Sequence, residues 1–287
     1  MDVDTGTDDA VAIMFAALHP DIDLVAITTV NGNVPLEQTT DNTLRVLEWI
    51  GRGDIPVYAG MNMQIARQDF PAPRAKRRDP KVHMPVLPLP EPKGSRQATS
   101  APQFLVDAFG TEPGMTLVAV APMSNLATAI ALDPAFVGNV VELVIMGGGI
   151  FRSNMTASAE FNVWADPEAT AVVFSAGFSK ITLIPLDATH QARVSLAQCA
   201  ALRELDTPAS KVAAEVIEFR IHGYQLNALA GEVPDSAPVR DALCIAALLE
   251  PSVIDLRRVN VVVETVGEYT IGATVIDHAF LTKREPN

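Results

Sequence analysis

Short apolar runs alternate with longer helical patterns along most of the chain. Runs rich in β-branched and other apolar residues predict buried strands at residues 23–30, 55–60, 115–120, 140–146 and 180–186. Helical patterns occupy residues 10–18, 35–50, 99–109, 124–132, the stretch from 166 onward, 195–229 and 239–249. Residues 259–263 and 269–275 predict a final antiparallel pair. The fold class is therefore α/β, with a doubly wound, mostly parallel sheet flanked by helices and a small antiparallel element near the C-terminus.

The alternation is interrupted once, at residues 64–97. This stretch holds seven prolines and the basic run at residues 74–78. A loop of this length is either a functional lid or a disordered surface segment. The basic run is expected to be exposed to solvent and not to form a binding patch. His83, near the middle of the loop, could reach into a site or lie on the surface. With no internal repeat, residues 1–287 are predicted to be a single domain.

Both ends of the chain look incomplete. A parallel strand should precede the acidic turn that begins at Asp2, yet only Met1 does so, and no closing element follows Leu281. We therefore expect that the first strand and the C-terminal end are missing.

Composition narrows the function classes. The chain has 48% hydrophobic residues, enough for a sizeable core, and a net charge of −13, which argues against nucleic-acid and anionic membrane partners. Its two cysteines, Cys199 and Cys244, lie in helical patterns and are expected to be buried thiols. No apolar run approaches the ~20 residues that span a bilayer. These features predict a cytoplasmic protein.

The first candidate chemistry is the sequence Asp-Val-Asp-Thr-Gly-Thr-Asp-Asp at residues 2–9. Four crowded carboxylates repel one another unless a cation sits among them, and a hard divalent ion such as Ca²⁺ or Mg²⁺ takes oxygen ligands. Asp8 and Asp9 could instead complement the N-terminus of the following helix. That alternative leaves Asp2 and Asp4 unexplained, so the stretch predicts an ion site.

Further polar clusters fall where the predicted strands end, at residues 31–33, 124–125, 154–162 and 240–241. In open parallel sheets, ligands bind beyond the carboxyl ends of the strands. These clusters would therefore line one crevice, with an ion and many hydrogen-bonding groups for hydroxyls, which suits a sugar. Ser124 is also placed to cap the helix that runs through residue 132. The glycines at 147–149 allow close backbone approach, but they lack a dinucleotide-binding spacing.

The opening motif, Asp-x-Asp-x-Gly-x-Asp-Asp-Ala, resembles that of the inosine–uridine nucleoside hydrolases, which cleave the N-glycosidic bond of ribonucleosides. The segments at 27–33, 121–126, 146–149, 154–162 and 185–190 also resemble that family, in its order. The resemblance implies a nucleoside hydrolase-like fold, Ca²⁺ as the cofactor and a homodimer or homotetramer. It also implies a role in purine or pyrimidine salvage.

The resemblance also implies roles for individual residues. Asp4, Asp9, Asp241 and the backbone carbonyl of Ser124 would hold Ca²⁺. A second set would hold the ribose: Asp8, Asn33, Met146, Asn154, Glu160 and Asn162. Asp4 could also accept a proton from the attacking water, and the surrounding carboxylates would stabilise an oxocarbenium-like ribosyl group.

Arg240 departs from the family pattern, because many members have a histidine there that protonates the leaving base. Arginine stays protonated at any working pH and is a poor proton donor. Arg240 could stabilise charge on the departing base or bind a phosphate or carboxylate of the substrate. Otherwise, His83 or His222 could supply the acid.

Two other functions remain open. Asp2-Val3-Asp4-Thr5 also matches the Asp-x-Asp-x-Thr motif of haloacid-dehalogenase-type phosphatases, in which Mg²⁺ is the ion. That fold needs a lysine and a late acidic pair, for which no convincing motif is found. A non-catalytic nucleoside- or sugar-binding homologue that lost its leaving-group acid is the third possibility.

Overall fold

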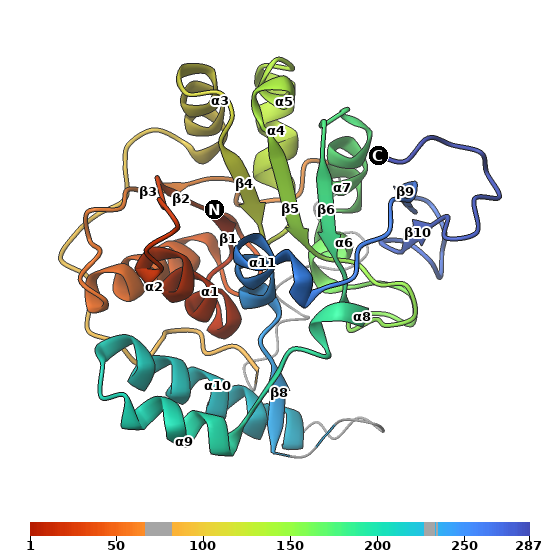
Figure 1. Cartoon of the computed structure of the whole chain (residues 1–287). Helices are drawn as coiled ribbons and strands as arrows, with labels where there is room; N and C mark the ends of the chain where they lie inside the picture. The colour runs from red at the N-terminus through yellow and green to blue at the C-terminus, as the bar shows by residue number, and fades with distance from the viewer. Residues whose placement is uncertain (67–81, 227–232, 234) are drawn as a thin grey trace.

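The computed structural model describes residues 1–66, 82–226, 233 and 235–287. Its centre is a parallel sheet with the strand order β3-β2-β1-β4-β5-β6 (Figure 1). The strands are β1 (Asp2–Val3), β2 (Ile27–Thr29), β3 (Val57–Ala59), β4 (Thr116–Ala119), β5 (Glu142–Met146) and β6 (Ile181–Ile184). The predicted doubly wound parallel sheet is confirmed.

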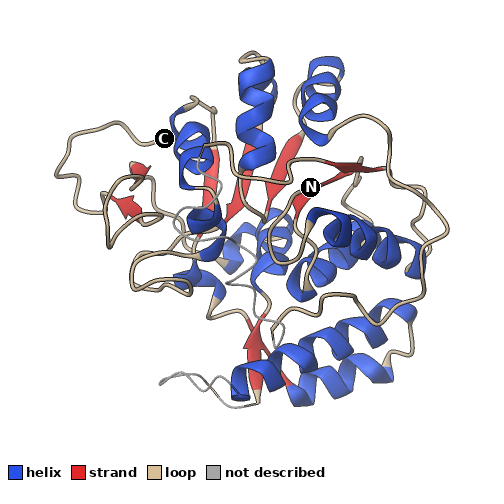
Figure 2. Cartoon of the chain, turned by 180° about the vertical axis from the view of Figure 1, so that it is seen from behind, coloured by secondary structure: helices blue, strands red, loops and turns tan. Residues whose placement is uncertain are grey.

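Helices cover both faces of the sheet (Figures 1 and 2). The first face carries α1 (Thr7–Leu18), α2 (Leu36–Trp49) and α11 (Arg240–Leu249). Helix α10 (Pro208–Leu226) joins the same cluster by packing against α1. The opposite face carries α3 (Ala101–Thr111), α4 (Ser124–Leu132), α5 (Phe136–Asn139) and α7 (Pro167–Ser175). Alternate residues of β4 and β5 face opposite clusters, since Val118 and Val144 pack in the first while Leu117 and Leu143 pack in the second.

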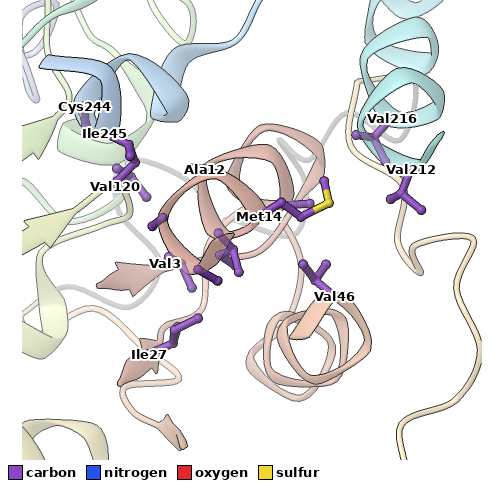
Figure 3. Close-up of a cluster of buried hydrophobic side chains, with 14 of the residues drawn as sticks. Val3, Ala12, Met14, Ile27, Val46, Val120, Val212, Val216, Cys244 and Ile245 are labelled. Atoms are coloured by element: carbon purple, nitrogen blue, oxygen red, sulfur yellow. The ribbon is translucent and has the colours of Figure 1, made fainter. Parts of the chain in front are cut away.

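Helix α1 connects most of the first cluster. It packs against α2, α10 and α11, and Figure 3 shows its Ala12 and Met14 among side chains from the sheet and these helices. Because α1 is held on several sides, its N-terminal turn, which contains the acidic residues, has a fixed position relative to α10 and α11.

The start of the chain differs from the prediction. Asp2 and Val3 themselves form β1, paired in parallel with β2 and β4, so a strand is present within the acidic stretch. Helix α1 then begins at Thr7, earlier than predicted, with Asp8 and Asp9 in its first turn. The strand was missed because two residues are too short a run to produce a recognisable apolar pattern.

The helical pattern predicted at residues 195–229 is confirmed over most of its described part, but it forms two helices instead of one. The chain forms β7 (Arg193–Ser195), α9 (Leu196–Glu204) and α10, and β8 (Ser236–Pro238) pairs antiparallel with β7. Pro208 begins α10, and Asp206 before it has a positive φ of 53°, so one helix cannot run through this point. Residues 227–229 of the prediction lie outside the described residues.

Several short elements escaped prediction. They are α5, α6 (Phe161–Ala165), α8 (Leu186–Thr189) and the 3₁₀ turn η2 (Pro251–Val253). The antiparallel pair near the C-terminus is confirmed, as β9 (Val261–Val263) and β10 (Thr274–Ile276). Cys199 and Cys244 are buried free thiols, as expected. Among the helices of the described residues, none is long and apolar enough to cross a membrane.

Candidate active site

The acidic residues gather beside the point where the strand order reverses. β2 and β3 lie on one side of β1, whereas β4, β5 and β6 lie on the other. The chain therefore diverges after β1 and β4, and their carboxyl ends form the switch point, the place where open α/β sheets bind ligands. The loop after β1 and the first turn of α1 supply Asp4, Asp8 and Asp9, and the first turn of α11 supplies Asp241.

Three of these carboxylates form a compact group. One oxygen each from Asp8, Asp9 and Asp241 lies within 4.8 Å of the others, and all three residues are buried. Buried carboxylates this close cannot all stay ionised without a compensating cation. The residues therefore fit a hard divalent metal ion, which takes several oxygen ligands. Asp9 and Asp241 belong both to this group and to the ligand set expected from the sequence.

Asp4 lies beside this group, fixed by Asn33. The backbone N–H of Asn33 donates to Asp4 Oδ2 at 2.6 Å, and its side-chain amide donates to Asp4 Oδ1 at 3.0 Å and to Asp9 Oδ2 at 3.2 Å. Asp9 also accepts from the backbone N–H groups of Asp4 and Gly6, at 3.1 and 2.9 Å. The amide nitrogen of Asn33 thus holds two carboxylates.

Burial and the mutual repulsion of these carboxylates raise the pKa values of Asp4, Asp9 and Asp241. Burial, and then the neighbouring Asp9, hold the pKa of Asp4 well above its usual range. Burial and Asp8 raise the pKa of Asp9 to about 6. Burial, followed by Asp8, Asp9 and Asp4, holds the pKa of Asp241 well above its usual range. These shifts have the pattern of a site that needs an added cation.

Asp8 differs because it is paired. Arg220 Nη1 lies 2.9 Å from Asp8 Oδ1, and His83 Nδ1 lies 3.6 Å from the same oxygen. Burial alone would raise the pKa of Asp8, but Arg220, then His83 and Arg240, outweigh burial and lower it. Of the two positions that the sequence left open for His83, the structure shows the one that reaches the site and not the one on the surface.

Sequence reasoning missed Arg220. Its side chain is 0% exposed on α10, and it also donates to Thr7 Oγ1 at 3.0 Å. A signal was present, since Arg220 falls four and eight residues after Val216 and Val212, on the buried stripe of α10. A basic residue on a buried stripe needs a carboxylate partner, and Asp8 is that partner.

Arg240 is buried in the same region. Its Nη2 donates to the Tyr224 hydroxyl, and its Cζ lies 5.9 Å from the centroid of the Tyr224 ring. Burial opposes the charge of Arg240, yet Tyr224 and the carboxylates of Asp8, Glu160 and Asp241 raise its pKa. Tyr224 was also missed from the sequence. His222, the other histidine considered as an acid, is exposed.

The loop at residues 154–162 is held at the ends of β4 and β5. Glu160 caps α6, and its Oε2 accepts from the backbone N–H groups of Asn162, Gly148 and Val163. Burial raises its pKa despite these bonds. Asn162 donates to the carbonyls of Val120 and Met146, at 3.0 and 3.1 Å, so it ties β4 and β5 to the loop.

The remaining predicted site residues differ in their burial and hydrogen bonding. Met146 is 2% exposed at the end of β5, whereas Asn154 is exposed and accepts from Phe161 N–H through its side chain at 2.8 Å. The predicted capping by Ser124 is wrong, because its hydroxyl donates to Asp166 Oδ2 at 2.6 Å and Met123 is the N-cap. The Ser124 carbonyl accepts from Thr128 Oγ1 at 2.8 Å.

Asp2 does not belong to the carboxylate group. Its Oδ1 accepts from Thr28 Oγ1 and Asn125 Nδ2, at 2.5 and 2.7 Å, so it ties β1 to β2 and α4. Burial raises the pKa of Asp2 to about 6. Asp2 therefore supports the backbone from which Asp4 projects.

Comparison with known proteins identifies the family of this chain. The family model described as inosine-uridine preferring nucleoside hydrolase matches residues 1–287. The chain is 35% identical to the pyrimidine-specific ribonucleoside hydrolase RihA of Photobacterium profundum, over 100% of this chain and 91% of that protein. It is also 35% identical to the same-named protein of Shigella boydii, over 100% of this chain and 90% of that protein.

Solved structures of nucleoside hydrolases share the fold. A plant nucleoside hydrolase, PpNRh1, superposes with a TM-score of 0.89 at 29% identity, covering 100% of this chain and 88% of that one. A purine-preferring ribonucleoside hydrolase from Gardnerella vaginalis gives a TM-score of 0.88 at 26% identity, covering 99% and 90%. These matches do not favour the phosphatase or the non-catalytic binding protein. The chain therefore belongs to the inosine-uridine preferring nucleoside hydrolase family of N-glycosyl hydrolases.

Proposed function

We propose that this chain hydrolyses the N-glycosidic bond of pyrimidine ribonucleosides, with Ca²⁺ as its cofactor, and releases ribose and the free base. The buried group of Asp8, Asp9 and Asp241 at the switch point carries the proposal. The pyrimidine preference is supported by the 35% identity to relatives named as pyrimidine-specific ribonucleoside hydrolases.

The ion would be held by Asp9 and Asp241, with oxygens from Asp4, Asp8 and the Ser124 carbonyl completing the shell. The carboxylates are buried and mutually repulsive, and the ligands are all oxygens, which suits Ca²⁺. When bound, the ion supplies Lewis acidity to its oxygen ligands.

The chain's own residues would then do three things. Asp8, Asn33, Asn154, Glu160 and Asn162 would hold the ribose hydroxyls, with Met146 beneath the ring. This grip fixes the anomeric carbon against the nucleophile. Asp4 would take a proton from the attacking water, as a general base whose carboxylate Asn33 orients. The surrounding carboxylates would stabilise positive charge developing on the ribosyl group.

Release of ribose is the direct test. Purified protein with excess Ca²⁺ should release ribose from uridine, and a chelator should abolish the release, because the carboxylates would be left without their cation. The same assay on 2′-deoxyuridine should show a much lower rate, since a group built to hold the 2′-hydroxyl would be left buried and unpaired. Release of phosphate from a phosphomonoester, with no ribose from uridine, would contradict the proposal.

Gly32 offers a mutational test of the position of Asp4. A Cβ at Gly32 would lie 1.9 Å from Asp4 Oδ2, so Gly32→Ala must push that carboxylate away. We expect kcat/KM for uridine to fall about 100-fold, the loss that a displacement near 1 Å can cause. Gly110→Ala is the matched control, because a Cβ there meets nothing within 4 Å. Equal activity of the two variants would remove Asp4 from the reaction.

A further inference from the structure

Arg240 is a permanent cation where a proton donor would be expected. It is 9% exposed, in the first turn of α11 beside Asp241. A guanidinium keeps its protons at any working pH, so it cannot protonate a leaving base. It can, however, donate hydrogen bonds and present a fixed positive charge to an anion.

The side chain of Arg240 is buried close to residues that are proposed to hold the ribose. Although burial opposes the charge of Arg240, the negative charges of Asp8 and Glu160 stabilise the guanidinium and raise its pKa. Asp8 lies in the first turn of α1 and Glu160 is the N-cap of α6, and both are proposed to contact the ribose. Tyr224 holds one end of the guanidinium through its hydroxyl oxygen. Within the described residues, the Nε–H of Arg240 is buried and has no hydrogen-bond partner. A buried unpaired donor on a cation is costly unless a ligand accepts from it.

We propose that Arg240 stabilises the departing base as an anion, so that the substrates are ribonucleosides whose base leaves readily without protonation, dioxopyrimidines such as uridine before cytidine. This inference rests on the proposed function. The C1′–N1 bond breaks and its electron pair goes to N1. The water oxygen bonds to C1′ and gives its proton to Asp4, and Arg240 keeps all its protons. The base anion takes its proton from solvent after it is released.

The chemistry of the two bases explains the preference. Two carbonyl groups delocalise the negative charge of the uracil anion, whereas cytosine has one carbonyl and an amino group, which makes its anion less stable. A fixed cation lowers the cost of the charge that develops on either base, but it does not remove the dependence on that charge. The rate should therefore rise steeply with the acidity of the leaving group.

The test compares kcat/KM for 5-fluorouridine, uridine, cytidine and 4-nitrophenyl β-D-ribofuranoside, with Ca²⁺ present. The wild type should cleave 5-fluorouridine faster than uridine, and uridine faster than cytidine. Arg240→Met should lower the value for uridine about 100-fold, the usual cost of losing one stabilising donor, and lower it less for the nitrophenyl riboside. Arg240→Lys should recover part of the loss. Arg240→His should flatten the series, because imidazolium can donate a proton.

Contrary outcomes are separable. If the nitrophenyl riboside is cleaved and all nucleosides react equally fast, the proposed function stands and the role of Arg240 is overturned. If kcat/KM depends more steeply on the acidity of the leaving base in Tyr224→Phe than in Arg240→Met, proton donation would be assigned to Tyr224. That result would also overturn the role proposed for Arg240. If neither the nitrophenyl riboside nor any nucleoside is cleaved, the proposed function falls and this inference falls with it.

Discussion

Replacing Asp9 by alanine or asparagine should abolish Ca²⁺ binding and ribose release together. Asp9 lies in the buried carboxylate group with Asp8 and Asp241, and it is also bridged to Asp4 by Asn33. Loss of one anionic ligand lowers both the charge and the number of oxygens available to the ion. We expect Ca²⁺ affinity, measured by titration calorimetry, to fall by at least about 100-fold, since loss of even an outer-shell partner costs about 10–100-fold.

The asparagine variant separates binding from folding. Its remaining oxygen can still accept from the N–H of Asp4 or of Gly6, which the Asp9 carboxylate now serves. Because the substituted side chain would carry no charge, the repulsion that raises the pKa of Asp4 would also weaken. The metal-free variant should therefore melt no lower than the wild type. Asp107→Asn, on the exposed side of α3, is the matched control. Unchanged Ca²⁺ affinity in Asp9→Asn would remove Asp9 from the metal site.

Replacing Arg220 by methionine should destabilise the metal-free protein strongly. Arg220 is fully buried and its Nη1 lies 2.9 Å from Asp8 Oδ1, so the variant leaves a buried carboxylate without its nearest cation. Breaking one side of a buried ion pair costs about 3–5 kcal/mol. Methionine keeps most of the apolar stem, so the loss reports the missing charge. Urea unfolding in the presence of a chelator measures it.

Arg203→Met provides a control on the neighbouring helix. Arg203 on α9 pairs with Glu218 on α10, and the side chain of Arg203 is 43% exposed. An exposed pair of this kind contributes about 0–1 kcal/mol. Saturating Ca²⁺ should shrink the defect of Arg220→Met, because the ion restores positive charge beside Asp8, but it should leave that of Arg203→Met unchanged. Equal losses in the two variants would show that Arg220 does not neutralise Asp8.

Much of the site was visible from the sequence because its residues follow strand ends. In a doubly wound sheet, those ends converge on one rim, so the acidic stretch and residues 31–33 had to meet. Membership in the family was predictable for the same reason, since its motifs occupy these turns. Residues 240–241 follow β8, which lies outside that sheet, and the packing of α11 against α1 brings them to the site. The buried cysteines and the final hairpin followed from local pattern alone.

Other features depend on contacts between distant segments. Arg220 belongs to a helix whose sequence reads as an ordinary amphipathic element, and only the packing of α10 against α1 brings it to Asp8. The antiparallel pairing of β7 and β8 joins segments about 40 residues apart, with three residues in each strand. Periodicity records which face of an element is buried, but not which element covers it.

The sequence by itself therefore determined the α/β class, the carboxylates of the proposed metal site and the departure from the family pattern at Arg240. The tertiary structure decided how those charges are shared: Asp8 is paired with Arg220, Asp4 is held by Asn33, and Arg240 is held by Tyr224. The physical reason is that the state of a buried charge depends on everything within a few ångströms of it. Those neighbours come from α1, α10, α11 and the loop after β2, which meet only when the sheet and its helices are packed.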